Sequence, residues 1–445
     1  MLAMSETAAA KEALDGNPVA LSPVFPAGSR VDAAGHLVVG GCDLTEVAAE
    51  FGTPAYVYAP ADIRERARAY VAGIAGLEGR EDDHEVLFAS KAAPISAIYE
   101  LCLREGLSVD VASGGELYMA LRAGFAGDRI YMHGNNKTEP ELRLALESGV
   151  GHLIVDSLDE IDRLEELLDR PQRVLIRLTP GIKPSTHSYV QTGQLDSKFG
   201  FGLEGGAAAE AVARIAASRH LELAGLHAHI GSQIFELEPF ERAIEAIGEF
   251  SREHAPDPDL VNVGGGLGIA YAGSDEPPSI AGYVAAKVGA VRRVFGTGPR
   301  VLLEPGRSLV GNAGLTLYEV GTVKTVPGVR TYVAVDGGMS DNLRPMLYGS
   351  RYEAILANRA ADRADAEVTI AGMHCESGDI LLEGASLPTP RRGDLVAMPA
   401  TGAYGHAMAN NYNGVPRPPV IFCEDGVARV VVRRESWEDL VRRDV

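Results

Sequence analysis

Eight short aliphatic runs, separated by segments with a helical pattern, place the strongest constraint on the fold of this chain. The runs begin at Val86, Leu107, Arg129, His152, Val174, Leu221, Asp259 and Val301. The first five are about 22 residues apart, a spacing typical of repeated βα units. Eight such units predict an α/β fold built on a closed (β/α)8 barrel. A doubly wound open sheet is the alternative, and it is less favoured because no GxGxxG loop follows the first run.

Two stretches at opposite ends of the sequence do not share this repeat. Residues 28–58 and 311–445 contain short alternating or β-branched segments, such as TPAYVYA and VARVVVRR, with turn residues between them. We therefore expect a second, mainly β domain built from 28–58 and 311–445, with the barrel inserted as residues 59–310. Residues 1–27 begin with a stretch rich in Ala, Glu, Pro and Ser, and we expect them to form a mobile tail.

Charge and cysteine content argue against several classes of protein. The 445 residues include 61 Asp and Glu against 41 Lys and Arg, a net charge of -20, which disfavours binding to nucleic acid or to an anionic membrane. The four cysteines are far apart in the sequence and form no CxxC pair, so neither a disulfide framework nor a zinc site is expected. With no signal peptide and no long apolar stretch, we predict a cytoplasmic protein without a metal cofactor.

Polar or glycine residues follow nearly every aliphatic run. In a (β/α)8 barrel the active site lies at the carboxyl ends of the strands, where these residues are expected. They are Lys91, Asp110, His133, Asp156, Arg177, His227, His229, the Gly264–Gly266 run, Glu304 and Arg307. Taken singly, such residues are more often solvated caps or core histidines, but their common position after the strands predicts a site.

Three of these positions indicate a particular chemistry. Lys91 follows the apolar letters VLF, and a lysine held against an apolar wall can form a Schiff base; a partly buried, ion-paired lysine is the ordinary alternative. Gly265 and Gly266 follow the seventh run and Gly306 the eighth, the usual phosphate position in barrels. Glu304 lies among apolar residues and needs a cationic partner, either a pyridinium nitrogen or Arg307.

The C-terminal region adds loops that combine glycine with polar and aromatic residues. The segment HCESGD contains Cys375 and Glu376, RPMLYG contains Arg344 and Tyr348, and TGAYGH contains Tyr404. Loops of this composition are typical of binding sites rather than of strand cores. A lone cysteine beside an acid is, without this context, more often a buried apolar residue.

These motifs, in this order, resemble those of the fold type III pyridoxal-phosphate decarboxylases. The matching stretches span about residues 28–440 and include FASKAAP, VDVASGGELYMAL, MHGNNK, GLHAHIGSQI, VGGGLGI, EPGRSLV, RPMLYG, HCESGD and GAYGHAMANNYN. CESGD together with RPMLYG is similar to the branch that decarboxylates meso-2,6-diaminopimelate to L-lysine and CO2, the last step of lysine biosynthesis. The ornithine and arginine decarboxylases differ at these stretches.

The resemblance implies a role for each candidate residue. Around the cofactor, pyridoxal 5'-phosphate, Lys91 forms the Schiff base, His229 stacks on the ring, Glu304 pairs with the ring nitrogen, and the phosphate is held by Ser232, Gly265, Gly266, Gly306 and Arg307. Around the substrate, carboxylate contacts come from Arg307, Arg344 and Tyr348, while Glu376 binds the distal ammonium. Tyr404 touches both cofactor and substrate, and Cys375 is the proton donor. The resemblance also implies a homodimer in which each active site is shared by both subunits.

Three other functions compete with this interpretation. An amino-acid racemase on the same fold would be favoured by an arginine opposite the ring nitrogen, where this chain has Glu304. A decarboxylase of ornithine, arginine or lysine would not need the intact CESGD segment. A non-catalytic relative is expected to have lost Lys91 or Cys375, and both are present.

Overall fold

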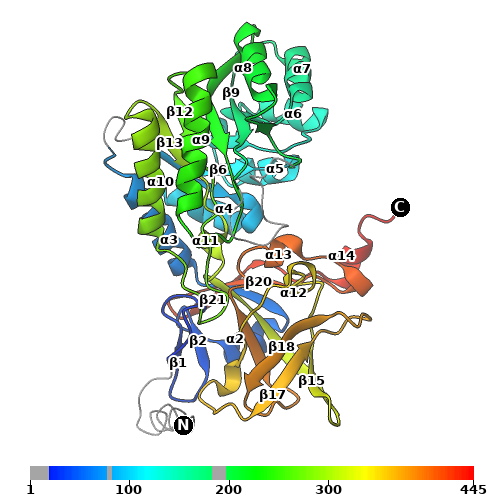
Figure 1. Ribbon diagram of the computed structural model, residues 1–445. Coiled ribbons are helices and arrows are strands. Elements are labelled where there is room, and N and C mark those ends of the chain that lie inside the picture. Colours follow the sequence, from blue (N-terminus) through cyan, green and yellow to red (C-terminus); the bar gives the residue numbers. More distant parts are fainter. Residues whose placement is uncertain (1–19, 78–82, 183–196) are drawn as a thin grey trace. The chain divides into compact units, whose positions relative to one another are not determined.

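The computed structural model describes residues 20–77, 83–182 and 197–445 (Figure 1). These residues form two compact units. One contains the described part of 1–63 together with 270–275 and 310–445, and the other contains the described parts of 64–269 and 276–309. The expected tail therefore lies largely outside the described residues, as does much of the THSYVQTGQLDSKFGF segment.

The second unit is a closed barrel of eight parallel strands. Its strands are β5 (Glu85–Ala89), β6 (Ser108–Val111), β7 (Ile130–Met132), β8 (His152–Val155), β9 (Gln172–Thr179), β11 (Leu221–Ala228), β12 (Leu260–Asn262) and β13 (Arg300–Leu303). Pairing of β13 with β5 and of β8 with β9 closes the ring, and the short β10 (Phe201–Gly202) adds to β9. The predicted barrel is confirmed, and the closure excludes the open-sheet alternative.

Amphipathic helices connect the strands and form the outer layer. They are α4 (Ser96–Arg104), α5 (Gly114–Arg122), α6 (Glu139–Glu147), α7 (Leu158–Leu167), α8 (Ala207–Ala217), α9 (Glu238–His254) and α10 (Ile280–Phe295), with α3 (Pro60–Ile74) before β5 and α11 (Arg307–Val310) after β13. Polar caps fix where several of them begin: the Ser113 and Ser157 side chains accept from backbone N–H groups of α5 and α7, and Thr138 forms a capping box with Glu141.

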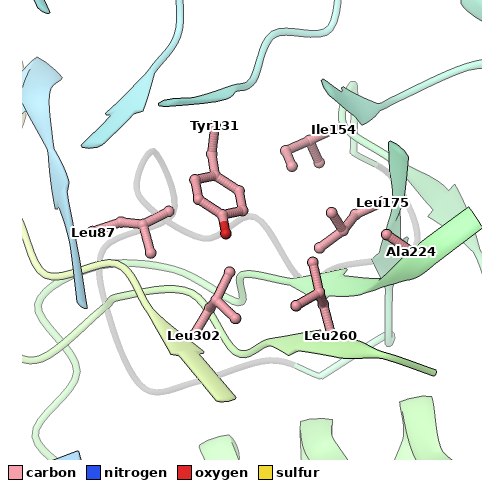
Figure 2. Close-up of a cluster of buried hydrophobic side chains, with 7 residues drawn as sticks. All are labelled: Leu87, Tyr131, Ile154, Leu175, Ala224, Leu260 and Leu302. Atoms are coloured by element: carbon pink, nitrogen blue, oxygen red, sulfur yellow. The ribbon is translucent and has the colours of Figure 1, made fainter. Parts of the chain in front are cut away.

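Side chains from the strands fill the interior of the barrel. Figure 2 shows one buried cluster whose members come from seven of the eight strands and point toward one another. The cluster comprises Leu87, Tyr131, Ile154, Leu175, Ala224, Leu260 and Leu302. Because this layer is packed with side chains, the barrel is a solid core and not a pore, and chemistry is confined to its ends.

The first unit is mainly β and combines segments from the two sides of the barrel in the sequence, 20–63 and 310–445, as predicted. Its strands are β1 (Arg30–Val31), β2 (Leu37–Val39), β3 (Cys42–Asp43), β4 (Ala55–Tyr58), β14 (Gly314–Val326), β15 (Arg330–Val335), β16 (Ile355–Leu356), β17 (Ala366–Ala371), β18 (Ile380–Leu387), β19 (Leu395–Pro399), β20 (Val420–Glu424) and β21 (Val427–Val432). The N-terminal β4 lies between β14, which it pairs antiparallel, and β20, which it pairs parallel. The short helices are α2 (Leu44–Phe51), α12 (Arg344–Tyr348), α13 (Gly405–Met408) and α14 (Trp437–Val441).

The four cysteines are free, and three of them are buried. Cys42 on β3 and Cys423 on β20 come from opposite ends of the sequence, yet each thiol is close enough to affect the pKa of the other. Distance along the sequence therefore did not predict which cysteines are neighbours. None of the described helices combines the length and apolar character needed to cross a lipid bilayer.

Candidate active site

Glu304 follows β13 and is the centre of a buried polar network at the carboxyl end of the barrel strands. Its side chain is only 5% exposed. Oε1 accepts hydrogen bonds from His133 Nε2 at 2.8 Å and from Asn262 Nδ2 at 2.7 Å, and Oε2 accepts from His227 Nε2 at 3.2 Å. The strands β7, β11 and β12 thus each direct one donor at a single carboxylate.

This network keeps Glu304 ionised. Burial alone would favour the neutral acid, but the neighbouring His133 and His227 rings outweigh it and hold the Glu304 pKa well below its usual range. A carboxylate offers about four lone-pair positions, and these three donors leave one on Oε2. Glu304 can therefore accept one more hydrogen bond from a cationic N–H group, which is the partner that a protonated pyridine nitrogen requires.

His133, His227 and Glu304 are also residue types that bind metal ions. Ligand atoms of His133, His227 and Glu304 lie within 4.8 Å of one another. A zinc ion with ligands at about 2.0–2.2 Å keeps its ligand atoms more than about 3 Å apart. The 2.8 Å His133–Glu304 contact is shorter than that, so the present geometry is that of direct hydrogen bonds.

Lys91 lies in a short 3-10 turn, Ser90–Ala92, directly after β5. Its Nζ is 4.0 Å from Asp110 Oδ2, and its side chain is 49% exposed. The preceding residues Val86, Leu87 and Phe88 are buried in the core, and the turn carries Lys91 to a half-exposed position. Burial raises the pKa of Asp110, although His133 and Lys91 oppose this. The exposed amine is accessible to a carbonyl compound.

The glycine run after β12 is shaped by close backbone contacts. A Cβ at Gly265 would lie 2.1 Å from the Glu304 carbonyl oxygen, and Gly264 has a φ of +61°, so neither position accommodates a side chain without strain. The Gly265 N–H donates to His229 Nδ1 at 3.3 Å. Burial and the charge of Lys91 hold the His229 pKa well below its usual range, so this imidazole is neutral and suited to stacking on a ring.

Ser232 and Arg307 lie beside this run. Arg307 donates from Nε and Nη2 to Ser232 Oγ at 3.1 and 3.0 Å. Arg307 does not pair with Glu304, whose partners are the two histidines and Asn262, so the arginine alternative for that carboxylate is not formed. At Gly306, a Cβ would lie 3.0 Å from the Ala89 Cβ, so this turn packs closely against β5. A guanidinium, a hydroxyl and a glycine loop together suit a phosphate group.

A second group of candidate residues belongs to the β unit and surrounds Arg344. This buried guanidinium donates from Nε to the Tyr352 hydroxyl at 3.1 Å and from Nη2 to Ser350 Oγ at 3.2 Å. Its Cζ lies 5.2 Å from the Tyr348 ring centre and 5.4 Å from that of Tyr404. In the described parts of the chain no carboxylate forms an ion pair with Arg344, so its charge is balanced by tyrosine rings and hydroxyls, an arrangement that can receive a carboxylate.

Tyr404 has a backbone conformation that side-chain-bearing residues rarely adopt. Its φ is +65°, in the left-handed region. Such a conformation costs about 1–3 kcal/mol and persists where the surroundings impose it, commonly at binding sites. This strain directs attention to the same tyrosine that the sequence motif singled out.

Cys375 and Glu376 are exposed on the β unit, away from the barrel strands in sequence. The backbone N–H of Cys375 donates to Asn413 Oδ1 at 3.1 Å, and Glu376 Oε1 accepts from the Tyr412 hydroxyl at 2.7 Å. Within the described chain, no hydrogen bond or ion pair joins either residue to Arg344. The structure therefore groups the candidates as a barrel site, an Arg344 cluster and an exposed Cys375–Glu376 segment.

Sequence reasoning missed Asn262 and Lys287 as contributors to the barrel site. Asn262 ends β12 and bonds both Glu304 and the Gly264 N–H, and Lys287 on α10 contacts the glycine run. In each case a signal was available, because a polar residue occurs where an apolar one is expected: inside a buried strand, or on the apolar face of a helix.

Comparisons with known proteins agree with this geometry. Residues 61–311 match the family described as "Pyridoxal-dependent decarboxylase, pyridoxal binding domain". The diaminopimelate decarboxylase of Bacillus subtilis is 48% identical over 94% of this chain and 97% of its own length, and that of Actinosynnema pretiosum is 46% identical over 97% and 98%.

A solved structure is similar over nearly the whole chain. The diaminopimelate decarboxylase of M. jannaschii in complex with L-lysine has a TM-score of 0.86, is 31% identical and covers 94% of this chain and 97% of its own. A carboxylate acceptor, a glycine loop and a half-exposed lysine are groups of a kind that suits pyridoxal phosphate. The chain belongs to the diaminopimelate decarboxylases, a family of pyridoxal-phosphate-dependent lyases.

Proposed function

We propose that this protein decarboxylates meso-2,6-diaminopimelate to L-lysine and CO2, the last step of lysine biosynthesis. The observation that carries the proposal is the buried, ionised Glu304 with one acceptor position remaining, at the end of the barrel where Lys91 and the glycine loop also lie. A carboxylate acceptor at this position favours a protonated nitrogen in the ring of pyridoxal phosphate. The motifs of the β unit select the substrate.

When bound, pyridoxal phosphate supplies an electron sink for the pair released with CO2. Lys91 Nζ would hold the cofactor, Glu304 would hold a proton at its ring nitrogen, and neutral His229 would orient the ring. Ser232, Gly265, Gly266, Gly306 and Arg307 would hold the phosphate. Cys375 Sγ delivers the proton that replaces the lost carboxylate.

Substrate recognition rests on groups suited to an amino acid at both ends of one molecule. Arg344 and Tyr348, with Arg307, bind carboxylate, and Tyr404 contacts both cofactor and substrate. The Arg344 guanidinium is buried against aromatic rings, which strengthens its attraction for an anion. Glu376 binds the distal ammonium. Ornithine, lysine and arginine lack the distal carboxylate, so they leave Arg344 without its partner.

A homodimer with shared active sites completes the proposal. Cys375 and Glu376 are exposed in the single chain, and beside them Met373 is 54% exposed and Tyr412 is 40% exposed. An exposed proton donor is poorly protected from bulk water, and a second subunit that covers this segment would supply the protection. We place the enzyme in the cytoplasm, where a free, exposed cysteine stays reduced.

The test is CO2 release from meso-diaminopimelate, ornithine, arginine and lysine in the presence of added pyridoxal phosphate. We expect a preference for diaminopimelate on the order of 10⁴, because a buried group built for a substrate partner rejects analogues that lack it. Arg344→Ala should remove most of the preference. Arg330→Ala is the matched control, because Arg330 lies on the same unit and pairs with Glu383 at the surface.

Turnover of ornithine or lysine within about tenfold of diaminopimelate would contradict the substrate assignment, because a buried unpaired guanidinium predicts a far larger factor. It would leave a broader basic-amino-acid decarboxylase, the second candidate function. An unchanged preference in Arg344→Ala would contradict the role of that residue alone.

A further inference from the structure

Lys287 is a fully buried lysine on the apolar face of an outer helix of the barrel. It lies on α10, and its side chain is 1% exposed. Its neighbours on the buried face are Tyr283, Val284, Val288 and Val291. A charged residue is costly in such a position unless it has specific partners, so its contacts define what it does.

All the polar partners found for Lys287 are consecutive carbonyl groups of the glycine run. Nζ donates to the carbonyl oxygens of Val263 at 2.6 Å, Gly264 at 3.0 Å and Gly265 at 2.9 Å. Three such bonds use the three N–H groups of an ammonium. The ring centres of Phe240 and Tyr283 lie 4.5 and 4.6 Å from Nζ and cover the remaining space.

These contacts fix the direction of the loop. In a planar trans peptide the carbonyl and the following N–H point in opposite directions. Turning the carbonyls of Val263, Gly264 and Gly265 toward Lys287 therefore turns the N–H groups of residues 264–266 away from α10. Two of these N–H groups reach side chains of the site: that of Gly264 donates to Asn262 Oδ1 at 3.0 Å and that of Gly265 to His229 Nδ1 at 3.3 Å.

We infer that Lys287 is a positioning residue for the phosphate group of the cofactor. It gathers the three carbonyls behind the loop. The N–H groups of Gly264 and Gly265 then hold the Asn262 and His229 side chains, and the N–H of Gly266, for which the described residues provide no acceptor, is left for the anion. Lys287 itself does not touch the cofactor. The inference rests on the proposed function only in that the loop binds a phosphate ester.

The test compares two forms of the cofactor that differ in the phosphate alone. The full-length protein is freed of bound cofactor and titrated with pyridoxal 5'-phosphate and with pyridoxal, for the wild type and for Lys287→Met. We expect the dissociation constant for pyridoxal phosphate to rise on the order of 10- to 100-fold. The constant for pyridoxal should change little, because that ligand has no phosphate to place.

A matched control is available in the same barrel. Lys137 is also buried and donates to the Gly134 and Ile154 carbonyls at 3.0 and 2.7 Å, and to Glu160 at 2.7 Å. Lys137→Met removes a comparable buried ammonium that does not contact the glycine run. It should therefore not weaken phosphate binding selectively. If Lys287→Met fails to fold, Lys287→Gln, which keeps two N–H donors, replaces it.

Two results would overturn the inference. The first is unchanged affinity for pyridoxal phosphate in a folded Lys287 variant. The second is an equal loss for pyridoxal and pyridoxal phosphate, since that would show a general structural role. Neither result bears on the reaction itself, because the proposed function is tested separately by CO2 release from diaminopimelate and the other amino acids with the wild-type protein.

Discussion

His152, the first residue of β8, offers a measurement of how burial in the barrel controls stability. Its ring stacks on Tyr131 with centres 4.6 Å apart and planes 8° apart, and its side chain is 5% exposed. Neither ring nitrogen has a hydrogen-bond partner in the described structure. Burial, together with the nearby charges of Arg173 and Arg300, lowers the pKa of His152 from 6.5 to about 3.

The direction of the pH effect follows from these two pKa values. Between pH 6.5 and 3 the unfolded chain binds a proton at His152 that the folded protein does not bind. The free energy of unfolding is therefore fully retained above pH 6.5 and falls as the pH drops through this window. At pH 5 the loss from this one residue is about 2 kcal/mol relative to pH 8.

His152→Phe should remove this loss while keeping the stacked ring. The assay is urea unfolding at pH 8 and pH 5, followed by circular dichroism. Changes in packing are the same at both pH values, so the difference between the two pH values isolates the proton. The variant should lose about 2 kcal/mol less than the wild type on going to pH 5.

The control is Leu153→Val, a non-titrating change at the next residue of β8, which should destabilise equally at both pH values. Other buried histidines, such as His227 and His406, make the same pH-dependent contribution to the free energy of unfolding of the wild type and of both variants. Their contribution therefore cancels in the comparison. An equal pH-dependent loss in the His152→Phe variant and the wild type would refute the reasoning, because it would mean that His152 is protonated to the same extent in the folded and unfolded states.

Three further predictions concern the active site. Borohydride reduction should fix the cofactor on Lys91, and Lys91→Ala should abolish that label; a label on Lys198 instead would contradict the assignment. Glu304→Gln should keep cofactor bound but slow decarboxylation about 30- to 1000-fold, because it removes a buried charge contact, and unchanged turnover measured at saturating cofactor would contradict the role of Glu304. Mixing inactive Lys91→Ala and Cys375→Ala subunits should restore up to about a quarter of wild-type activity if sites are shared across a dimer. No recovery after verified subunit exchange would place both residues in one chain.

The barrel could be predicted because its signal is local and repeated. Each strand is a short aliphatic run and each helix is an amphipathic segment. The periodicity of hydrophobic residues along the sequence is therefore sufficient to identify the βα units. The β unit was predicted less completely. The strand β18 was missed because its sequence, ILLEGASL, contains an acid and a glycine that weaken the alternating pattern, and the helix α2 was missed between β3 and β4.

Site residues were predictable where a motif marks them, and less so where only the fold brings them together. The Glu304 carboxylate was identified from its apolar surroundings, but its partner Asn262 depends on which strands are neighbours in the closed barrel. Lys287 is separated from the glycine run by the loop of residues 267–279 and the first half of α10. The exposure of Lys91 depends on the 3-10 turn after β5, which the preceding apolar letters do not reveal.

The donors around residue 304 also decide between a decarboxylase and a racemase on this fold. His227 has its pKa lowered by burial to about 4, so near neutral pH it is uncharged and donates Nε2–H to Glu304 without neutralising it. Asn262 donates to the same carboxylate. An arginine at this position would meet these donors with donors of its own, since a guanidinium has no acceptor. The surroundings therefore suit an acceptor at residue 304. In the proposed function, an ionised acceptor there would keep the ring nitrogen of the cofactor protonated, which is the condition for a strong electron sink and for loss of CO2.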